Sequence, residues 1–136
     1  MKKTAINLIN SILKKDSSIL AAYLFGSQIK GSPNKYSDID IGILLGREVN
    51  IEKYTDIQIA VMNDISQKLN KEADVVILNR TSMFLKYYIL KNGIRIYEKP
   101  DRAEHLFEAR AIVEYFDFLP VKTMIENAIL KRVKEA

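Results

Sequence analysis

Two short motifs in this sequence carry residue types that can act on a phosphate compound. Asp38 and Asp40 lie two residues apart in the alternating segment 37–45, so we expect both side chains on one face of a strand. Two carboxylates held this close repel each other, and a divalent cation would remove the repulsion. Carboxylate oxygens suit hard ions such as Mg²⁺, which also takes phosphate oxygens as ligands. The spacing therefore predicts a metal site that works on a phosphorylated substrate.

The second motif is Gly26-Ser27, which follows the apolar run 19–25 directly and precedes Asp38 by a ten-residue gap. Glycine lets the backbone turn sharply and approach a ligand closely. Backbone N–H groups after such a turn, together with the Ser27 hydroxyl, can hold phosphate oxygens. A phosphate-binding turn beside two aspartates predicts phosphoryl or nucleotidyl transfer from a nucleoside triphosphate, in which bound metal stabilises the attacking and leaving oxygens.

Asp74, at the start of the apolar segment 73–78, is the candidate for a third carboxylate. If that segment is a strand beside 37–45, Asp74 would reach the same metal site and help to deprotonate an incoming hydroxyl. Glu72 is a weaker candidate for this role. The ordinary interpretation is that Asp38 and Asp40 form the solvent side of an amphipathic strand, but their spacing from Gly26-Ser27 favours the catalytic one.

These motifs need a scaffold of alternating helices and strands. Four segments have the apolar or alternating pattern of strands: 19–25, 37–45, 73–78 and 94–98. Five segments have helical periodicity or helix boundary signals: 4–14, 51–69, 82–91, 101–118 and 121–133. Asn92-Gly93 is expected to end the third helix in the left-handed conformation, and Pro120 to separate the last two helices. The pattern predicts one α+β (α/β) domain around a single sheet.

Length and composition indicate how many domains the protein has and which classes of partner and compartment it fits. A chain of 136 residues suits one domain. Its net charge of +4 is spread evenly, whereas a duplex-binding protein concentrates basic residues in a patch, so we expect no DNA partner. Cysteine is absent, which fits a reducing cytoplasm. No apolar run approaches the roughly 18 residues of a membrane helix, and no signal peptide is evident, so we expect a cytoplasmic protein without a membrane partner.

Gly26, Ser27, Asp38 and Asp40 at this spacing, with Asp74 as third carboxylate, resemble the signature of the DNA polymerase β-like nucleotidyltransferase superfamily. The short chain looks like its minimal nucleotidyltransferase branch, which includes the MntA-type antitoxins of HEPN/MNT toxin–antitoxin pairs. The resemblance implies a palm with a small mixed β-sheet flanked by helices over residues 1–99. Residues 100–136 would then be a C-terminal helical extension packed on the same domain.

The resemblance also implies the reaction and the role of each residue. Gly26 and Ser27 would bind ATP, while Asp38, Asp40 and Asp74 would be catalytic and hold Mg²⁺, with room for a two-metal site. The implied reaction transfers AMP to a hydroxyl of a HEPN-type toxin, which silences that ribonuclease. Two alternatives stay open: the acceptor is a small molecule or an RNA end, or the protein is a non-catalytic antitoxin that only binds its toxin.

The last part of the sequence suggests how a partner could bind. Residues 101–117 carry a local charge of −3, which is either a solvated helix face or a docking face for a basic partner. An apolar face in the last predicted helix must pack on the palm or meet a partner; it comprises Val121, Ile125, Ala128 and Ile129. The sequence is compatible with a homo-oligomer or a hetero-oligomer.

Overall fold

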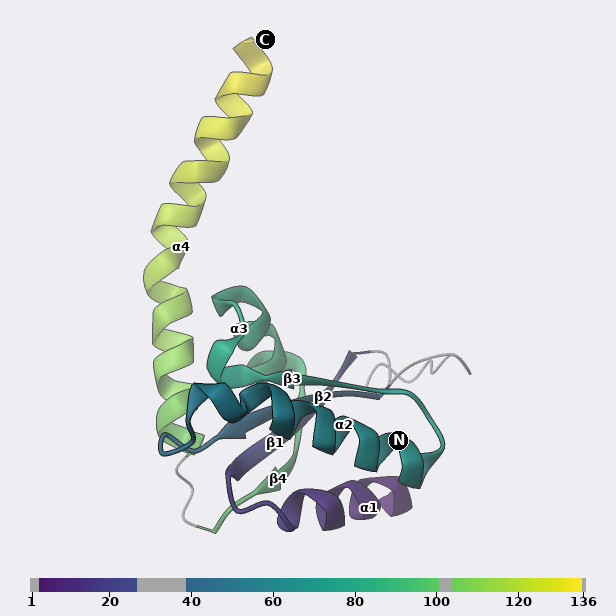
Figure 1. The fold of residues 1–136 in the computed structure, drawn as a ribbon. Coiled ribbons are helices and arrows are strands. Elements are labelled where there is room, and N and C mark those ends of the chain that lie inside the picture. Colours follow the sequence, from purple (N-terminus) through teal and green to yellow (C-terminus); the bar gives the residue numbers. More distant parts are fainter. Residues whose placement is uncertain (1–2, 27–38, 101–103, 136) are drawn as a thin grey trace.

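The computed structural model describes residues 3–26, 39–100 and 104–135. Helices and strands alternate along the chain (Figure 1). The helices are α1 (Lys3–Lys14), α2 (Tyr54–Leu69), α3 (Met83–Asn92) and α4 (Glu104–Glu135). The strands are β1 (Ile19–Phe25), β2 (Ile39–Leu45), β3 (Ala73–Ile77) and β4 (Ile94–Glu98). Short 3₁₀ turns precede α2 and follow β3: η2 (Ile51–Lys53) and η3 (Leu78–Arg80). All elements before α4 lie within a few residues of their predicted bounds.

The four strands form one mixed sheet in the order β3-β2-β1-β4. β1 is antiparallel to both of its neighbours, whereas β2 and β3 run parallel. Parallel neighbours need a crossover connection, and α2 provides it. The predicted α+β class with a small mixed sheet and flanking helices is therefore confirmed. Among the described residues, none of the helices is both long and apolar enough to cross a membrane.

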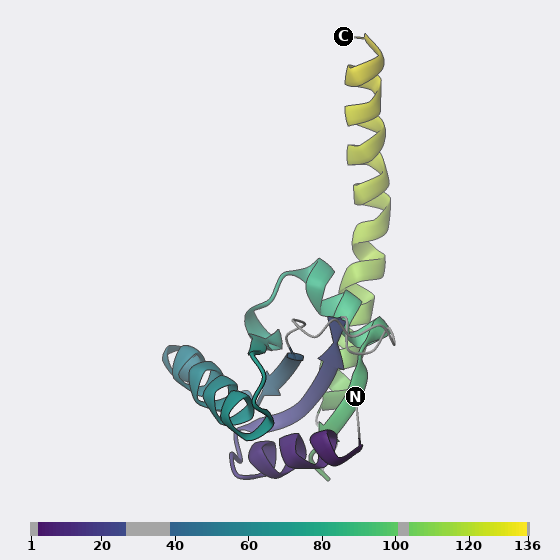
Figure 2. The same cartoon turned by 90° about the vertical axis from the view of Figure 1, so that its right-hand side faces the viewer.

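Helices cover both faces of this sheet. On one face, α1 and α2 pack over the larger part of the core, into which Ile39, Ile41 and Ile43 of β2 point. α3 lies on the other face, and a smaller cluster of buried residues fills the space beneath it (Figures 1 and 2). The predicted alternation of β2 is confirmed, because its isoleucines are fully buried in one layer. The opposite side of β2 is also covered along most of its length.

Two glycines let α3 approach the sheet closely. A Cβ on Gly42 of β2 would lie 3.1 Å from a methyl group of Leu78 and 3.4 Å from one of Ile89 in α3. A Cβ on Gly93 would crowd the carbonyl oxygen of Ile89 and lie 3.1 Å from that of Leu24. The predicted left-handed conformation of Gly93 is wrong, since its φ is −75° and its ψ 163°. Close packing of the backbone, rather than a positive φ, requires glycine at this turn.

The C-terminal part of the chain differs from the prediction of two helices. α4 is a single helix of 32 residues with Pro120 inside it. An internal proline removes one helical hydrogen bond and crowds the preceding turn, which costs about 3 kcal/mol. Residues 118–122 contain no glycine, asparagine or aspartate that would favour a turn instead, so the helix continues. The division into a palm of residues 1–99 and a packed extension of 100–136 stays a prediction.

The first half of α4 packs against the rest of the molecule through one face. Tyr115 stacks on Tyr87 of α3, with ring centroids 3.8 Å apart and an interplanar angle of 3°. Phe118 meets Phe84 edge-on at 5.5 Å. Every described residue beyond Lys122 is exposed, and Figures 1 and 2 show this end of α4 projecting away from the sheet.

Candidate functional site

Gly26 and Asp40, two of the residues singled out by their spacing, meet at one end of the sheet. Phe25, the last residue of β1, pairs with Asp40 in the antiparallel ladder, and Gly26 follows it. Gly26 has a φ of +83°, which L-residues with a Cβ rarely adopt. A Cβ built on Gly26 would lie directly against Oδ2 of Asp40 and 3.0 Å from its Cγ. Both the backbone conformation and the adjacent carboxylate therefore require glycine here.

Asp74 lies on the other side of Asp40. The parallel register of β2 and β3 places the two aspartates directly opposite each other. Opposite residues on neighbouring strands lie about 4.8 Å apart and point to the same face of the sheet. Asp40 is half-buried and Asp74 is exposed. The structure thus brings together the two carboxylates whose proximity the sequence predicted, at an end of the sheet that solvent can reach.

The other two predicted site residues, Ser27 and Asp38, lie outside the described residues. Each directly adjoins a described element: Ser27 follows Gly26, and Asp38 precedes Ile39 of β2. Their expected roles in phosphate and metal binding stay predictions. Glu72, the weaker alternative for the third carboxylate, is exposed and precedes β3, and its backbone carbonyl accepts a hydrogen bond from the N–H of Ile39.

The described part of this site fits a hard divalent cation. Asp40 and Asp74 supply short carboxylate side chains from adjacent strands, which is the donor chemistry that Mg²⁺ prefers. A Cβ on Gly26 would overlap the Asp40 carboxylate, so glycine at this position lets that carboxylate stay beside β1 and opposite Asp74.

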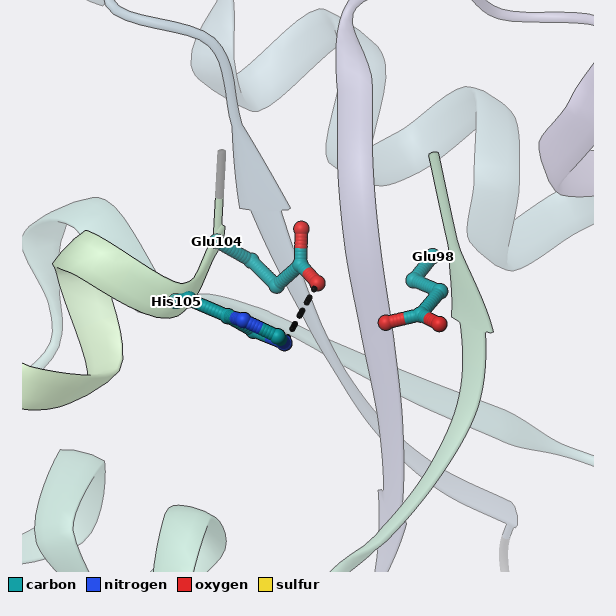
Figure 3. Close-up of side chains that lie close together, drawn as sticks. All are labelled: Glu98, Glu104 and His105. Carbon is teal, nitrogen blue, oxygen red and sulfur yellow. Dashed lines mark ion pairs between the residues drawn. The ribbon is translucent and has the colours of Figure 1, made fainter. Parts of the chain in front are cut away.

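A second group of ionisable side chains lies near the other end of β1. Glu98, at the end of β4, pairs with Ala21, and Figure 3 shows it beside Glu104 and His105 of α4. Nε2 of His105 lies 3.3 Å from Oε1 of Glu104. Burial raises the pKa of the Glu104 carboxyl, as does the neighbouring Glu98, whereas His105 lowers it. The structure buries Glu104 fully.

A polar network anchors the start of α4 to the sheet. The hydroxyl of Tyr23 in β1 and the guanidinium of Arg95 in β4 both donate hydrogen bonds to Oε1 of Glu108. Arg95 also pairs with Glu98 at 3.2 Å. Burial raises the pKa of the Tyr23 hydroxyl, and the adjacent Glu108 raises it further. Sequence analysis did not predict this network. A helical pattern indicates which face of a helix is buried, but it does not indicate which distant residues that face contacts.

Comparison with known proteins identifies the family. Residues 7–102 match the family described as "Polymerase beta, Nucleotidyltransferase". The chain belongs to this nucleotidyltransferase family. The matched range spans the whole sheet and thus includes the Gly26, Asp40 and Asp74 end of it. The predicted membership of the polymerase β-like superfamily is confirmed.

Individual relatives of this nucleotidyltransferase support the same assignment. It is 24% identical over 123 residues to the protein adenylyltransferase MntA of Aphanizomenon flos-aquae (strain 2012/KM1/D3), covering 85% of this chain and 82% of the relative. Its fold resembles a chain in the crystal structure of a toxin–antitoxin with AMP-PNP, with a TM-score of 0.75 and 21% identity, over 92% of this chain and 98% of the other.

A further solved structure contains a tri-AMPylated HEPN toxin of Shewanella oneidensis in complex with its MNT antitoxin. The similarity to it has a TM-score of 0.72 and 21% identity, over 96% of this nucleotidyltransferase and 99% of the other chain. At these identities the two structural matches show that the fold is shared. The matches cover 92% and 96% of this chain.

Proposed function

We propose that this nucleotidyltransferase transfers AMP from ATP to a hydroxyl of a partner protein, and that it is an antitoxin that silences a HEPN-type ribonuclease in this way. The observation that carries the proposal is the meeting of Gly26, Asp40 and Asp74 at one end of the sheet. The family assignment supports nucleotidyl transfer. The similarity to an adenylyltransferase named MntA supports AMP as the transferred group and a protein as its acceptor.

In the proposed reaction, the phosphate chain of ATP lies beside Gly26. The backbone after Gly26 and the Ser27 hydroxyl would hold the β- and γ-phosphates. Asp38 and Asp40 would hold one Mg²⁺, and Asp74 a second. Bound Mg²⁺ would neutralise phosphate charge and stabilise the attacking and leaving oxygens. The missing Cβ of Gly26 is essential to this arrangement, because a side chain there would displace the Asp40 carboxylate.

The transfer itself exchanges one phosphorus–oxygen bond for another. The acceptor hydroxyl oxygen forms a bond to the α-phosphorus of ATP, while the bond from that phosphorus to the oxygen bridging to the β-phosphate breaks. Pyrophosphate leaves with the electron pair of the broken bond. The proton of the hydroxyl passes to a carboxylate of the site, for which exposed Asp74 is best placed, because an acceptor can approach it from solvent.

A labelling experiment tests this proposal. The protein is mixed with Mg²⁺, ATP labelled on the α-phosphate, and the protein encoded by the adjacent gene. We expect label on the partner, and we expect Asp40→Asn and Asp74→Asn to reduce its rate of appearance by about 100-fold or more, in the range seen when a transition-state-stabilising group is removed. Asp64→Asn is the matched control, since Asp64 is an exposed aspartate of α2 on the opposite side of the sheet.

The outcomes separate the proposed reaction from its alternatives. Absence of label on any protein would reject protein adenylylation, and label on added RNA ends or small hydroxyl compounds would identify another acceptor. If Asp40→Asn and Asp74→Asn abolish labelling yet still neutralise the partner fully, the protein acts as a stoichiometric antitoxin. Loss of both labelling and neutralisation with an unchanged fold supports catalysis.

A further inference from the structure

The distal half of α4 carries an apolar face that no described part of the chain covers. Val121, Ile125, Ile129 and Val133 follow one another at intervals of four residues, so they line one side of the helix. Their side chains are between 46% and 67% exposed. A contiguous row of exposed apolar side chains is typical of a protein interaction site. Of the two outcomes that the sequence allowed for this face, packing on the palm does not occur among the described residues.

The uncovered apolar face lies on the same side of α4 as the residues by which the first half of this helix packs. Ala111, Tyr115 and Phe118 face α3 and the sheet, and helical periodicity carries the same face on to Ile125 and Ile129. Figure 1 shows that α4 passes α3 and continues beyond it. The packing surface of the helix thus extends beyond the part of the molecule that covers it.

The charges around this face indicate the kind of partner that fits. Residues 121–135 carry four basic side chains and two acidic ones, a net charge of +2. The basic residues are Lys122, Lys131, Arg132 and Lys134. Two copies of this helix packed together would bring like net charges into contact, which disfavours a second copy of the chain. A partner with an acidic rim would complement them.

We propose that residues 121–135 of α4 are the docking surface for the acceptor protein. The acceptor would lay an apolar, acid-rimmed helical surface along Val121, Ile125 and Ile129, as amphipathic helices do in apolar grooves. This inference rests on the proposed function, because it names where the acceptor binds. A Cβ built on Gly42 would point to α3, and Asp40, two residues earlier on β2, faces the same side of the sheet, so an acceptor held on distal α4 would lie on the side of Asp40 and Asp74.

Binding and labelling measured separately test this inference. Ile125→Glu combined with Ile129→Glu places two charges in the centre of the face. Asn127→Glu adds one negative charge to the opposite side of the helix and serves as the control. All three positions are exposed, so far-ultraviolet circular dichroism should show an unchanged fold. Affinity for the protein encoded by the adjacent gene is measured by calorimetry, and label transfer from ATP is measured as kcat and KM.

We expect the double variant to bind the acceptor at least about 30-fold more weakly, as when interface hot spots are lost, and the control to stay within about threefold of wild type. The KM for the acceptor should rise while kcat at saturation is retained. Unchanged affinity of the double variant would overturn the docking surface even if labelling proceeds. Sedimentation of the free protein as a dimer that the double variant dissociates would overturn it in favour of a second copy.

The same experiment distinguishes this inference from the function on which it rests. Wild-type protein that binds the adjacent-gene product without labelling it, and whose binding the double variant removes, would reject protein adenylylation and support the docking surface. Wild-type protein that binds no adjacent-gene product would overturn the docking surface.

Discussion

Replacement of Gly26 by alanine tests the candidate site at the point where backbone and side-chain geometry meet. The φ of +83° leaves a non-glycine residue strained by about 1–2 kcal/mol. The new Cβ would also press on the Asp40 carboxylate, whose Cγ lies only 3.0 Å from the Cβ position. Relief of that overlap needs a shift of about 1 Å in the carboxylate, since carbon atoms in optimal contact lie at about 3.5–4.0 Å.

Backbone strain at residue 26 and displacement of the Asp40 carboxylate predict a small loss of stability and a larger loss of activity. The free energy of unfolding should fall by about 1–3 kcal/mol, from strain and crowding together. AMP transfer should fall further, by about 100-fold, because a displacement of about 1 Å in a reacting group has an effect of that order. Urea denaturation measures the first loss, and initial rates of label transfer from ATP measure the second.

Gly46→Ala is the matched control for this substitution. Its Cβ would meet the carboxylate of Glu48, the far end of an exposed and flexible side chain that can move away. Gly46 directly follows β2, at the end of the sheet remote from Asp40. We expect less than about 0.5 kcal/mol of destabilisation, because the Glu48 carboxylate can move away from the added methyl group, and unchanged transfer.

A double-mutant cycle separates strain from crowding. In an Asp40→Ala background the carboxylate is gone, so Gly26→Ala should retain only the cost of its backbone conformation. An equal cost in both backgrounds would show that the two residues do not touch. Transfer by Gly26→Ala at the wild-type rate, with an unchanged urea midpoint, would refute the geometry of the site itself.

Three further substitutions test how α4 is held. Tyr23→Phe removes the hydrogen bond to Glu108 and should lower the free energy of unfolding by about 1 kcal/mol in urea denaturation, whereas Tyr88→Phe, which loses an exposed hydroxyl, should not. Burial raises the folded-state pKa of Glu104 above 4.5, so its contribution to stability is present below pH 4.5 and is lost as pH rises through the folded-state pKa. Glu104→Gln should therefore raise the free energy of unfolding at pH 7 relative to wild type and leave it unchanged at pH 4, by thermal melts at both pH values. Pro120→Ala should restore a helical hydrogen bond and raise helix content and stability by up to about 3 kcal/mol, measured by circular dichroism.

The local pattern of the sequence predicted most of the sheet and the meeting of its key residues. Alternating isoleucines at 39, 41 and 43 fixed which side of β2 enters the main core, and so placed Asp40 on the other side. Gly26 and Asp74 then meet Asp40 through strand pairing, one by the antiparallel and one by the parallel ladder. The sequence did not predict the strand order, because the alternation of side chains carries no information about which strands are neighbours.

Contacts between distant parts of the chain were not predictable in this way. Glu108 joins Tyr23 across 85 positions of sequence, and nothing in either local pattern marks the other as its partner. Pro120 suggested a break in the helix because proline is normally excluded from helix interiors. The penalty for proline is limited to one turn, and without turn-forming residues beside it the chain had no better alternative than to continue the helix.

Contacts of the acidic residues in the first half of α4 bear on the charge that we expect a partner to carry. Sequence analysis left residues 101–117, with their local charge of −3, as either a solvated helix face or a docking face for a basic partner. Three of the five acids there are engaged within the chain: Glu104 beside His105, Glu108 with Arg95, and Glu114 with Lys86. Beyond them lies the end of α4 at which every described residue after Lys122 is exposed, and the net charge of residues 121–135 is +2. An acceptor that docks on this surface should carry acidic groups, so its affinity should fall as salt rises, and Lys131→Glu should weaken binding where a basic partner would bind more tightly.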